Sequence, residues 1–267
     1  MNEQYKVQVQ NLVDDLKAVF THAGLGGEAG EYKLLTQSFL YKFLNDKFLY
    51  KAQDVDSENI YEHLVSMSEE DYDWLLEDIG TSTAWMKPNQ FIETLHRKQN
   101  EFDFYETFEN TLNQIAIDNN DIFSVHTDGN TAIRLFDERL ITDTVTDSSK
   151  RNEVAMAIIN LLAKVKFNQV IFSQGFDFFS TLFEYMIKDY NKDGGGKYAE
   201  YYTPHSVAKI IAEILVGNDK PQNVRIYDPS AGFRVIIMTQ ANSQVNTRVL
   251  ELLPKFKIKK MDRWCAA

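Results

Sequence analysis

The residues best suited to chemistry lie in two short stretches near the end of the chain. The turn Asp228-Pro-Ser-Ala-Gly232 follows Val224-Arg-Ile-Tyr227, whose residue types predict a short strand. Earlier, Thr203-Pro204 predicts the start of a helix, because threonine caps free amides and proline suits the first helical position. Ligands of open α/β sheets bind where strands end and helices begin. The acidic turn could therefore hold a charged ligand, although it also fits a plain tight connection.

The helix that follows Thr203 is needed to position such a site. It carries apolar residues at the three-and-four spacing of one face: Val207, Ile210, Ile211, Ile214 and Leu215. Gly217 and Pro221 end it. The order of helix, strand and acidic turn predicts the beginning of an α/β domain.

These elements resemble the methylation (modification) subunit of type I restriction-modification enzymes, which are adenine-N6 DNA methyltransferases. Residues 177–187, Asp-Phe-Phe-Ser-Thr-Leu-Phe-Glu-Tyr-Met-Ile, are similar to the segment that leads into the family's catalytic domain. Residues 200–204, Glu-Tyr-Tyr-Thr-Pro, are similar to its cofactor-contacting signature, and residues 226–232 to its first S-adenosylmethionine motif. The stretch from Glu31 to Phe48 resembles part of its helical N-terminal domain.

The resemblance implies S-adenosylmethionine as the cofactor. The cofactor-binding residues that it implies are Glu200, Tyr201, Tyr202, Thr203, Pro204, Asp228, Pro229, Ser230, Ala231 and Gly232. Asp228 would face the ammonium group of the cofactor, and the Thr203 hydroxyl with nearby amides would bind its carboxylate. The ring of Tyr202 or Tyr227 would lie beside the sulfonium.

The sequence also departs from the family. Phe233-Arg234 stand where a second motif glycine is expected, and the catalytic Asn-Pro-Pro-[Phe/Tyr] motif is absent from the sequence. No catalytic residue can therefore be named, and we expect the chain alone to be inactive. Only 39 residues follow Asp228 (267 minus 228), whereas one strand-helix-strand unit takes roughly 30 or more, so we expect a C-terminally truncated methyltransferase domain.

The tail differs in charge from the rest of the chain. Residues 248–263 contain six basic and two acidic side chains, a net charge of plus four. We expect the resemblance to end at Gly232 and the tail to be foreign sequence from a shortened or frame-altered gene product. The alternative is a basic arm that touches DNA. Glu251 could also hold ribose hydroxyls if residues 249–251 form a strand.

The front of the chain predicts helices. Apolar residues recur at helical spacing over residues 4–22, 31–51, 100–117, 151–166 and 177–190, and another helix is predicted to start at Phe91. Asn45 and Asp46 are expected on the outer side of their helix. The predicted fold is mainly α, with an all-helical N-terminal domain over residues 1–170. Residues 171–267 would hold the beginning of a Rossmann-like methyltransferase domain, with a divergent basic tail from about residue 233.

Clustered acids between residues 58 and 78 raise the possibility of a metal site. Their spacing lacks the glycine of a calcium loop, and no histidine has a second ligand at metal-binding spacing, so the cluster is interpreted as a solvated helix flank and no metal is predicted. The segment 122–145 predicts short strands or irregular turns.

Composition limits the function. The chain has 28 basic and 39 acidic residues, a net charge of −11, so any contact with double-stranded DNA must be local or shared with partners. The resemblance implies specificity and restriction subunits as those partners. One cysteine, no signal segment and no membrane-length apolar run favour a cytoplasmic protein. The alternative to a methyltransferase fragment is a non-catalytic helical module that docks DNA and these subunits.

Overall fold

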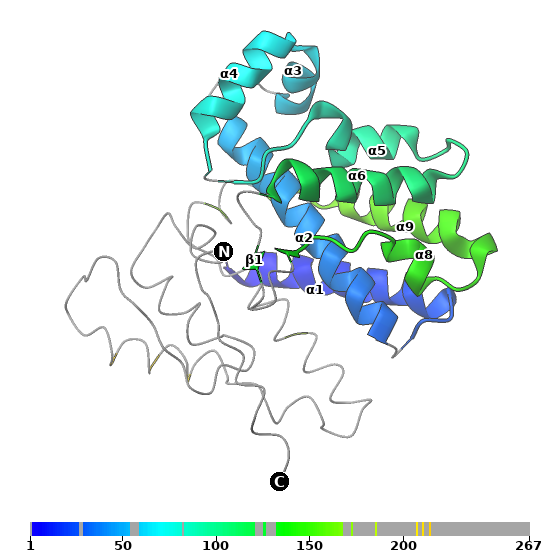
Figure 1. Cartoon of the computed structure of the whole chain (residues 1–267). Helices are drawn as coiled ribbons and strands as arrows, with labels where there is room; N and C mark the ends of the chain where they lie inside the picture. The colour runs from blue at the N-terminus through cyan, green and yellow to red at the C-terminus, as the bar shows by residue number, and fades with distance from the viewer. Residues whose placement is uncertain are drawn as a thin grey trace.

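The computed structural model describes residues 2–26, 29–53, 59–81, 83–120, 125–126 and 132–167, together with Phe172, Tyr185, Val207, Ile210 and Ile214. The described helices and strands follow in chain order: α1 (Asn2–His22), α2 (Ala29–Ala52), α3 (Ile60–Ser66), α4 (Glu69–Ile79), η1 (Pro88–Gln90), α5 (Ile92–Lys98), α6 (Phe104–Asp118), β1 (Val125–His126), β2 (Ala132–Ile133), α8 (Leu140–Thr144), η2 (Ser148–Lys150) and α9 (Arg151–Lys164). Figure 1 shows a helical bundle in which α5, α6 and α9 run side by side.

Helix α9 is the centre of this bundle. It contacts α1, α5 and α6, and also α2 and α8. Its sequence explains this position, because its buried apolar residues form one broad face: Val154, Ala155, Ile158, Ile159 and Leu162. A helix that is surrounded by neighbours needs apolar residues over such a wide face.

Helices α3 and α4 lie at one end of the molecule, beyond the other helices (Figure 1). They contact α2, and the ring of Tyr72 in α4 stacks on Phe48 of α2 at 6.5 Å between centroids. The Tyr72 hydroxyl donates a hydrogen bond of 2.6 Å to the carbonyl of Met86. Helix α4 ends at Ile79. Gly80 caps it with a φ of 58° that suits glycine, and the Gly80 carbonyl accepts a hydrogen bond from the indole of Trp85. The α3–α4 end is therefore attached through one face of α4, and α3 adds its own attachment through the buried Leu64 and the ring of Tyr61 against Phe91.

The mainly α fold predicted from the sequence is confirmed. The helices predicted over residues 4–22, 31–51 and 151–166 correspond to α1, α2 and α9. The segment 122–145 holds β1 and β2, which pair antiparallel with Val125 opposite Ile133, followed by α8. No described helix combines the length and the apolar composition that crossing a bilayer would require.

The helix predicted over residues 100–117 is real but begins later. It starts at Phe104, after Asp103 with its positive φ of 51°. Phe102 therefore lies in the preceding turn, and 92% of its surface is exposed, whereas Phe104 and Phe108 are buried. Periodicity alone does not find such a start, because the left-handed residue changes the phase of the chain.

Candidate functional site

The cofactor-binding residues predicted from the sequence, 200–204 and 228–232, lie outside the described residues. So do the Phe233-Arg234 departure and the tail. Of the helix predicted after Thr203, three residues are described, and Val207, Ile210 and Ile214 are all helical. Their side chains are 43%, 57% and 75% exposed. These three apolar side chains thus lie on the surface.

The described residues instead show how the helical body, which comprises helices α1 to α9, contacts the segment that leads toward the predicted cofactor residues. A buried polar network on α2 is the centre of this attachment. Lys42 and Asp46, four residues apart, form an ion pair of 2.9 Å, and both side chains are more than nine-tenths buried. The other oxygen of Asp46 accepts a hydrogen bond of 2.8 Å from the side-chain amide of Asn45.

This network links three separate elements. The Asn45 side-chain oxygen accepts a hydrogen bond of 3.0 Å from the backbone amide of Ile92, the first residue of α5. The first amides of a helix have no partner within it, and the cap residue of α5 supplies no side-chain bond, so Asn45 supplies one from α2. Asp46 also accepts a hydrogen bond of 2.8 Å from the amide of Phe167, just after α9. Helix α2 therefore fixes both the start of α5 and the chain that leaves α9.

The prediction that Asn45 and Asp46 lie on the outer side of their helix is wrong. They are 3% and 7% exposed. Helix α2 carries apolar side chains around its circumference and is covered on several sides, so its polar residues are buried as well and need internal partners. The signal that could have found the network is the lysine-asparagine-aspartate set at positions 42, 45 and 46, which share one helix face inside an aromatic run.

Burial controls the protonation of this network. Desolvation lowers the pKa of Lys42, Asp46 opposes that effect as the nearby counter-charge, and Lys166 adds to the lowering by repulsion. Tyr41, on the same helix, is completely enclosed, and burial followed by the negative charge of Asp46 raises the pKa of its hydroxyl well above 10. The Tyr41 hydroxyl donates a hydrogen bond of 2.7 Å to the carbonyl of Gln90.

Two further contacts continue beyond Phe167. The ring of Phe172 lies 5.7 Å from that of Phe43 and 5.4 Å from that of Tyr50, so it packs along the second half of α2. The hydroxyl of Tyr185 donates to the carboxylate of Asp14 on α1, at 2.7 Å and 2.8 Å from its two oxygens. The helical body thus contacts the chain at three successive places between residues 167 and 185.

A hollow of about 610 Å³ lies beside the network. Side chains from α2, α3, α5 and the end of α9 line it, and they combine charged groups (Lys42, Asp46, Arg97, Lys166) with aromatic rings (Tyr50, Tyr61, Phe91, Phe167). Arg97 lies over the ring of Tyr61 at 4.7 Å and pairs with Glu62 at 2.6 Å. Such a lining could accept a polar aromatic group, but the network that adjoins it is already internally paired.

A comparison of the sequence with known protein families relates the C-terminal part of the chain to one of them. Residues 174–253 match the family described as N-6 DNA methylase. The match supports an adenine DNA methyltransferase family, a class that acts on DNA and generally depends on S-adenosylmethionine. No solved structure matches the chain.

The matched segment includes both predicted cofactor motifs, residues 200–204 and 228–232. It also continues past Gly232 to residue 253, so the end of the resemblance was placed too early at Gly232. The matched segment starts at residue 174, just after Phe172, which packs on α2. Tyr185, which bonds Asp14 of α1, lies within the matched segment.

Proposed function

We propose that this chain carries the helical N-terminal domain and the first part of the methyltransferase domain of a type I restriction-modification modification subunit. The observation that carries the proposal is the match over residues 174–253, in which the Thr203-Pro204 and Asp228–Gly232 motifs follow in the family's order. The domain boundary in this proposal lies between residues 170 and 171. The methyl acceptor is adenine N6 in double-stranded DNA.

The residue types of the two motifs fit S-adenosylmethionine. Its amino-acid end carries an ammonium group, for which the Asp228 carboxylate is an acceptor, and a carboxylate, for which the Thr203 hydroxyl and the turn amides are donors. Gly232, without a side chain, lets the backbone approach the ligand closely. When bound, the cofactor supplies an activated methyl group. The contribution of the chain is to orient it, since alignment is the main requirement of methyl transfer.

The same proposal limits what this chain does alone. No Asn-Pro-Pro-[Phe/Tyr] sequence occurs in it, and this is the motif by which the family receives the adenine amino group. We therefore propose that the chain by itself binds the cofactor without transferring its methyl group. Contact with DNA is shared with specificity and restriction subunits, in keeping with the net charge of −11.

Calorimetric titration with S-adenosylmethionine tests the proposal. We expect binding in the micromolar range, and Asp228→Ala should weaken it at least tenfold, because the ammonium loses a charged acceptor. Asp219→Ala is the matched control, since it removes an acid from a nearby turn outside the motifs and should leave the affinity unchanged. Absence of heat with the unaltered chain would contradict a formed cofactor site.

The second candidate function is a non-catalytic module that docks DNA and the other subunits. The extensive helical body favours it, because most described residues belong to helices that have their own core. A chain that binds no S-adenosylmethionine but is retained by an immobilised specificity subunit would support this candidate. Failure of both the titration and the retention experiment would exclude both functions.

A further inference from the structure

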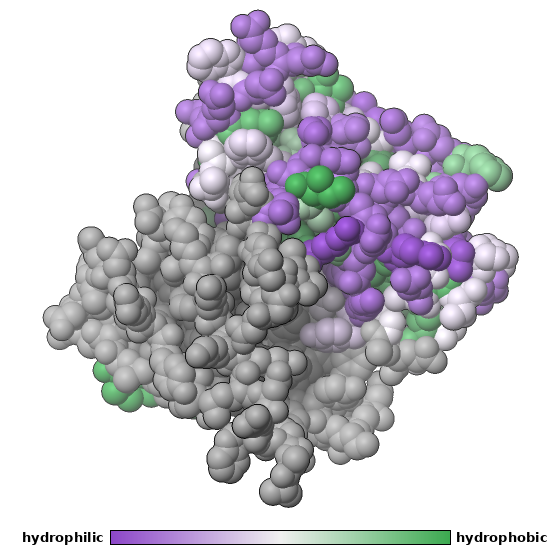
Figure 2. All heavy atoms as spheres, in the orientation of Figure 1, coloured by the Kyte–Doolittle hydropathy of each residue, from purple (hydrophilic) through white to green (hydrophobic). Residues whose placement is uncertain are grey.

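The α3–α4 end of the molecule has an unusual concentration of negative charge. From residue 52 to residue 86 the sequence has ten acidic side chains and no lysine or arginine. Within residues 59–81, which form α3, α4 and their flanks, there are seven acids: Glu62, Glu69, Glu70, Asp71, Asp73, Glu77 and Asp78. Among the described residues, only Glu62 of these seven has an ion pair, with Arg97 of α5. Figure 2 shows hydrophilic side chains predominating over this end.

One face of α4 combines this charge with apolar surface. Asp71, Trp74, Leu75 and Asp78 follow the spacing i, i+3, i+4 and i+7, which places them on a single stripe of the helix. The adjoining stripe, with Tyr72 and Ile79, is buried against the body. On the stripe with Trp74, Leu75 is partly buried against the core, whereas Asp71, Trp74 and Asp78 are exposed.

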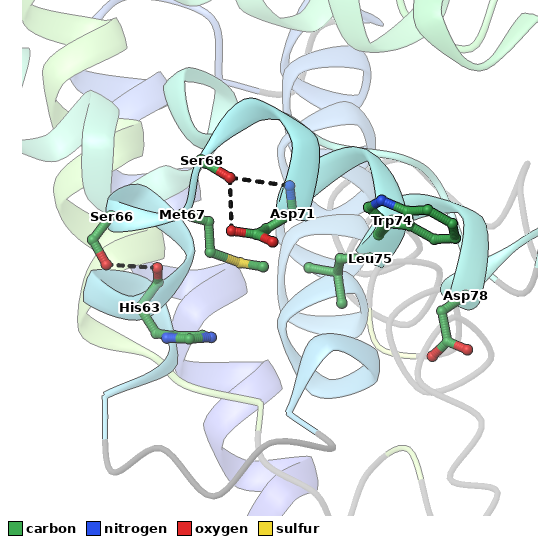
Figure 3. A pocket seen from close by; sticks show the side chains of 8 residues that line it. All are labelled: His63, Ser66, Met67, Ser68, Asp71, Trp74, Leu75 and Asp78. Carbon is green, nitrogen blue, oxygen red and sulfur yellow. Dashed lines mark hydrogen bonds between the residues drawn. The ribbon is translucent and has the colours of Figure 1, made fainter.

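This stripe forms one wall of a hollow of about 650 Å³ between α3 and α4. Figure 3 shows Met67 and Leu75 pointing toward one another at its floor, with Trp74 and Asp78 further along α4. Trp74 is 67% exposed, and neither its indole nor the carboxylate of Asp78 has a partner among the described residues. Asp71 is different, because it accepts a hydrogen bond of 2.6 Å from Ser68 and is held at the start of the helix.

We propose that the α3–α4 hollow is a docking site for a basic segment of a partner protein, with an arginine or lysine side chain on the face of Trp74. A cation on an exposed indole is attracted by the ring, and the free carboxylate of Asp78, one turn away, adds a counter-charge. The aliphatic stem of the same side chain covers Met67 and Leu75. The proposal does not depend on cofactor binding.

Two other occupants fit the surface poorly. A nucleic acid carries negative phosphates, which six carboxylates without ion pairs would repel. A metal ion would need a gathered set of ligands, and within the described ranges no group of three or more histidine, cysteine, aspartate or glutamate side chains is arranged to hold one. Charge complementarity therefore selects a basic protein segment.

Fluorescence anisotropy with a labelled peptide of alternating arginine and alanine residues tests the site on the full chain. We expect saturable binding that Trp74→Ala weakens about tenfold and Asp78→Asn about fivefold, while a peptide with glutamate in place of arginine does not bind. Glu77→Gln is the matched control, because it removes the same charge from the same helix without lining the hollow. It should change the affinity less than twofold.

The control separates a site from general attraction to an acidic protein. Equal losses in Asp78→Asn and Glu77→Gln, or no loss in Trp74→Ala, would overturn the proposal. So would a DNA duplex that loses affinity on Trp74→Ala, since the surface would then serve nucleic acid. Trp74 is mostly exposed, so the variant is expected to fold, and an unchanged helical circular dichroism spectrum establishes this.

Discussion

Lys42 and Asp46 form an ion pair in the interior of the protein, where both side chains are almost inaccessible to solvent. Asp46 also bonds Asn45 and the amide of Phe167. A buried ion pair contributes little compared with apolar packing, but removal of one partner leaves an uncompensated charge. The pair therefore serves to fix which elements meet at α2.

Replacement of one partner should be much more harmful than replacement of both. We expect Asp46→Ala to lower the free energy of unfolding by about 3–5 kcal/mol, because Lys42 is left charged and buried. The double variant Lys42→Met with Asp46→Leu should lose clearly less, because no charge is left buried and only the donors of Asn45 and Phe167 lose their acceptor. Urea unfolding followed by circular dichroism measures both, and equal losses in the two variants would contradict this account of the network.

The buried tyrosines predict a loss of stability in alkali. Burial raises the pKa of Tyr72 and of Tyr41 above the ordinary value of 10.0. Between pH 10 and their folded pKa, the folded chain keeps protons that the unfolded chain has lost, so stability is fully present below pH 10 and falls as the pH rises above it. Each tyrosine contributes a fall of about 1.4 kcal/mol per pH unit.

The slope of the unfolding free energy against pH, measured by urea unfolding from pH 9 to pH 11.5, tests this. Tyr72→Phe loses the hydrogen bond to Met86 but should show a shallower decline above pH 10. The lowered pKa of Lys42 acts in the opposite direction just below 10.5, where the unfolded chain still binds its proton, and it is common to both proteins. An unchanged slope in Tyr72→Phe would show that ionisation of the Tyr72 hydroxyl does not reduce the stability of the folded chain.

At the scale of elements, α9 packs against most of the other described helices. Ile158 has no exposed surface and lies on the helix that contacts α1, α5 and α6. Ile158→Ala should therefore lower the free energy of unfolding by about 2–5 kcal/mol, since it removes buried surface and leaves a cavity. Val7→Ala on α1, at a side chain that is 49% exposed, should cost less than about 1 kcal/mol. Thermal unfolding of the two variants measures the difference.

The positions of the long helices could be predicted from the sequence better than the contacts of single residues. Helices α1, α2 and α9 could be located from apolar periodicity, because each is long and its repeat is regular. The start of α6 could not, since Asp103 changes the backbone direction without a marked sequence signal. The set of polar residues at positions 42, 45 and 46 indicates a shared polar face of α2 but not its burial, which depends on α5 and α9 packing on the same part of that helix.

At the scale of the whole molecule, the helices α1 and α2 contact the chain that leads into the matched segment at Phe167 and Phe172, and the matched segment itself at Tyr185. Phe167 bonds Asp46, Phe172 packs on Phe43 and Tyr50, and Tyr185 bonds Asp14. These contacts lie far apart in the sequence, so only the structure could reveal them. The cofactor-binding residues stay a prediction from the sequence, because 200–204 and 228–232 lie outside the described residues, although the family match over 174–253 spans both motifs.

The central proposal is that the helix predicted to begin at Thr203 and the turn predicted at Asp228 form one site for S-adenosylmethionine. A crystal structure of the full chain grown with this cofactor tests it most directly, through the distance between the Asp228 carboxylate and the ammonium group. The account predicts a separation of about 2.7–3.2 Å, with Thr203 on the carboxylate side of the same molecule. A structure in which Thr203 and Asp228 lie far apart, or face into a packed interior, would contradict it.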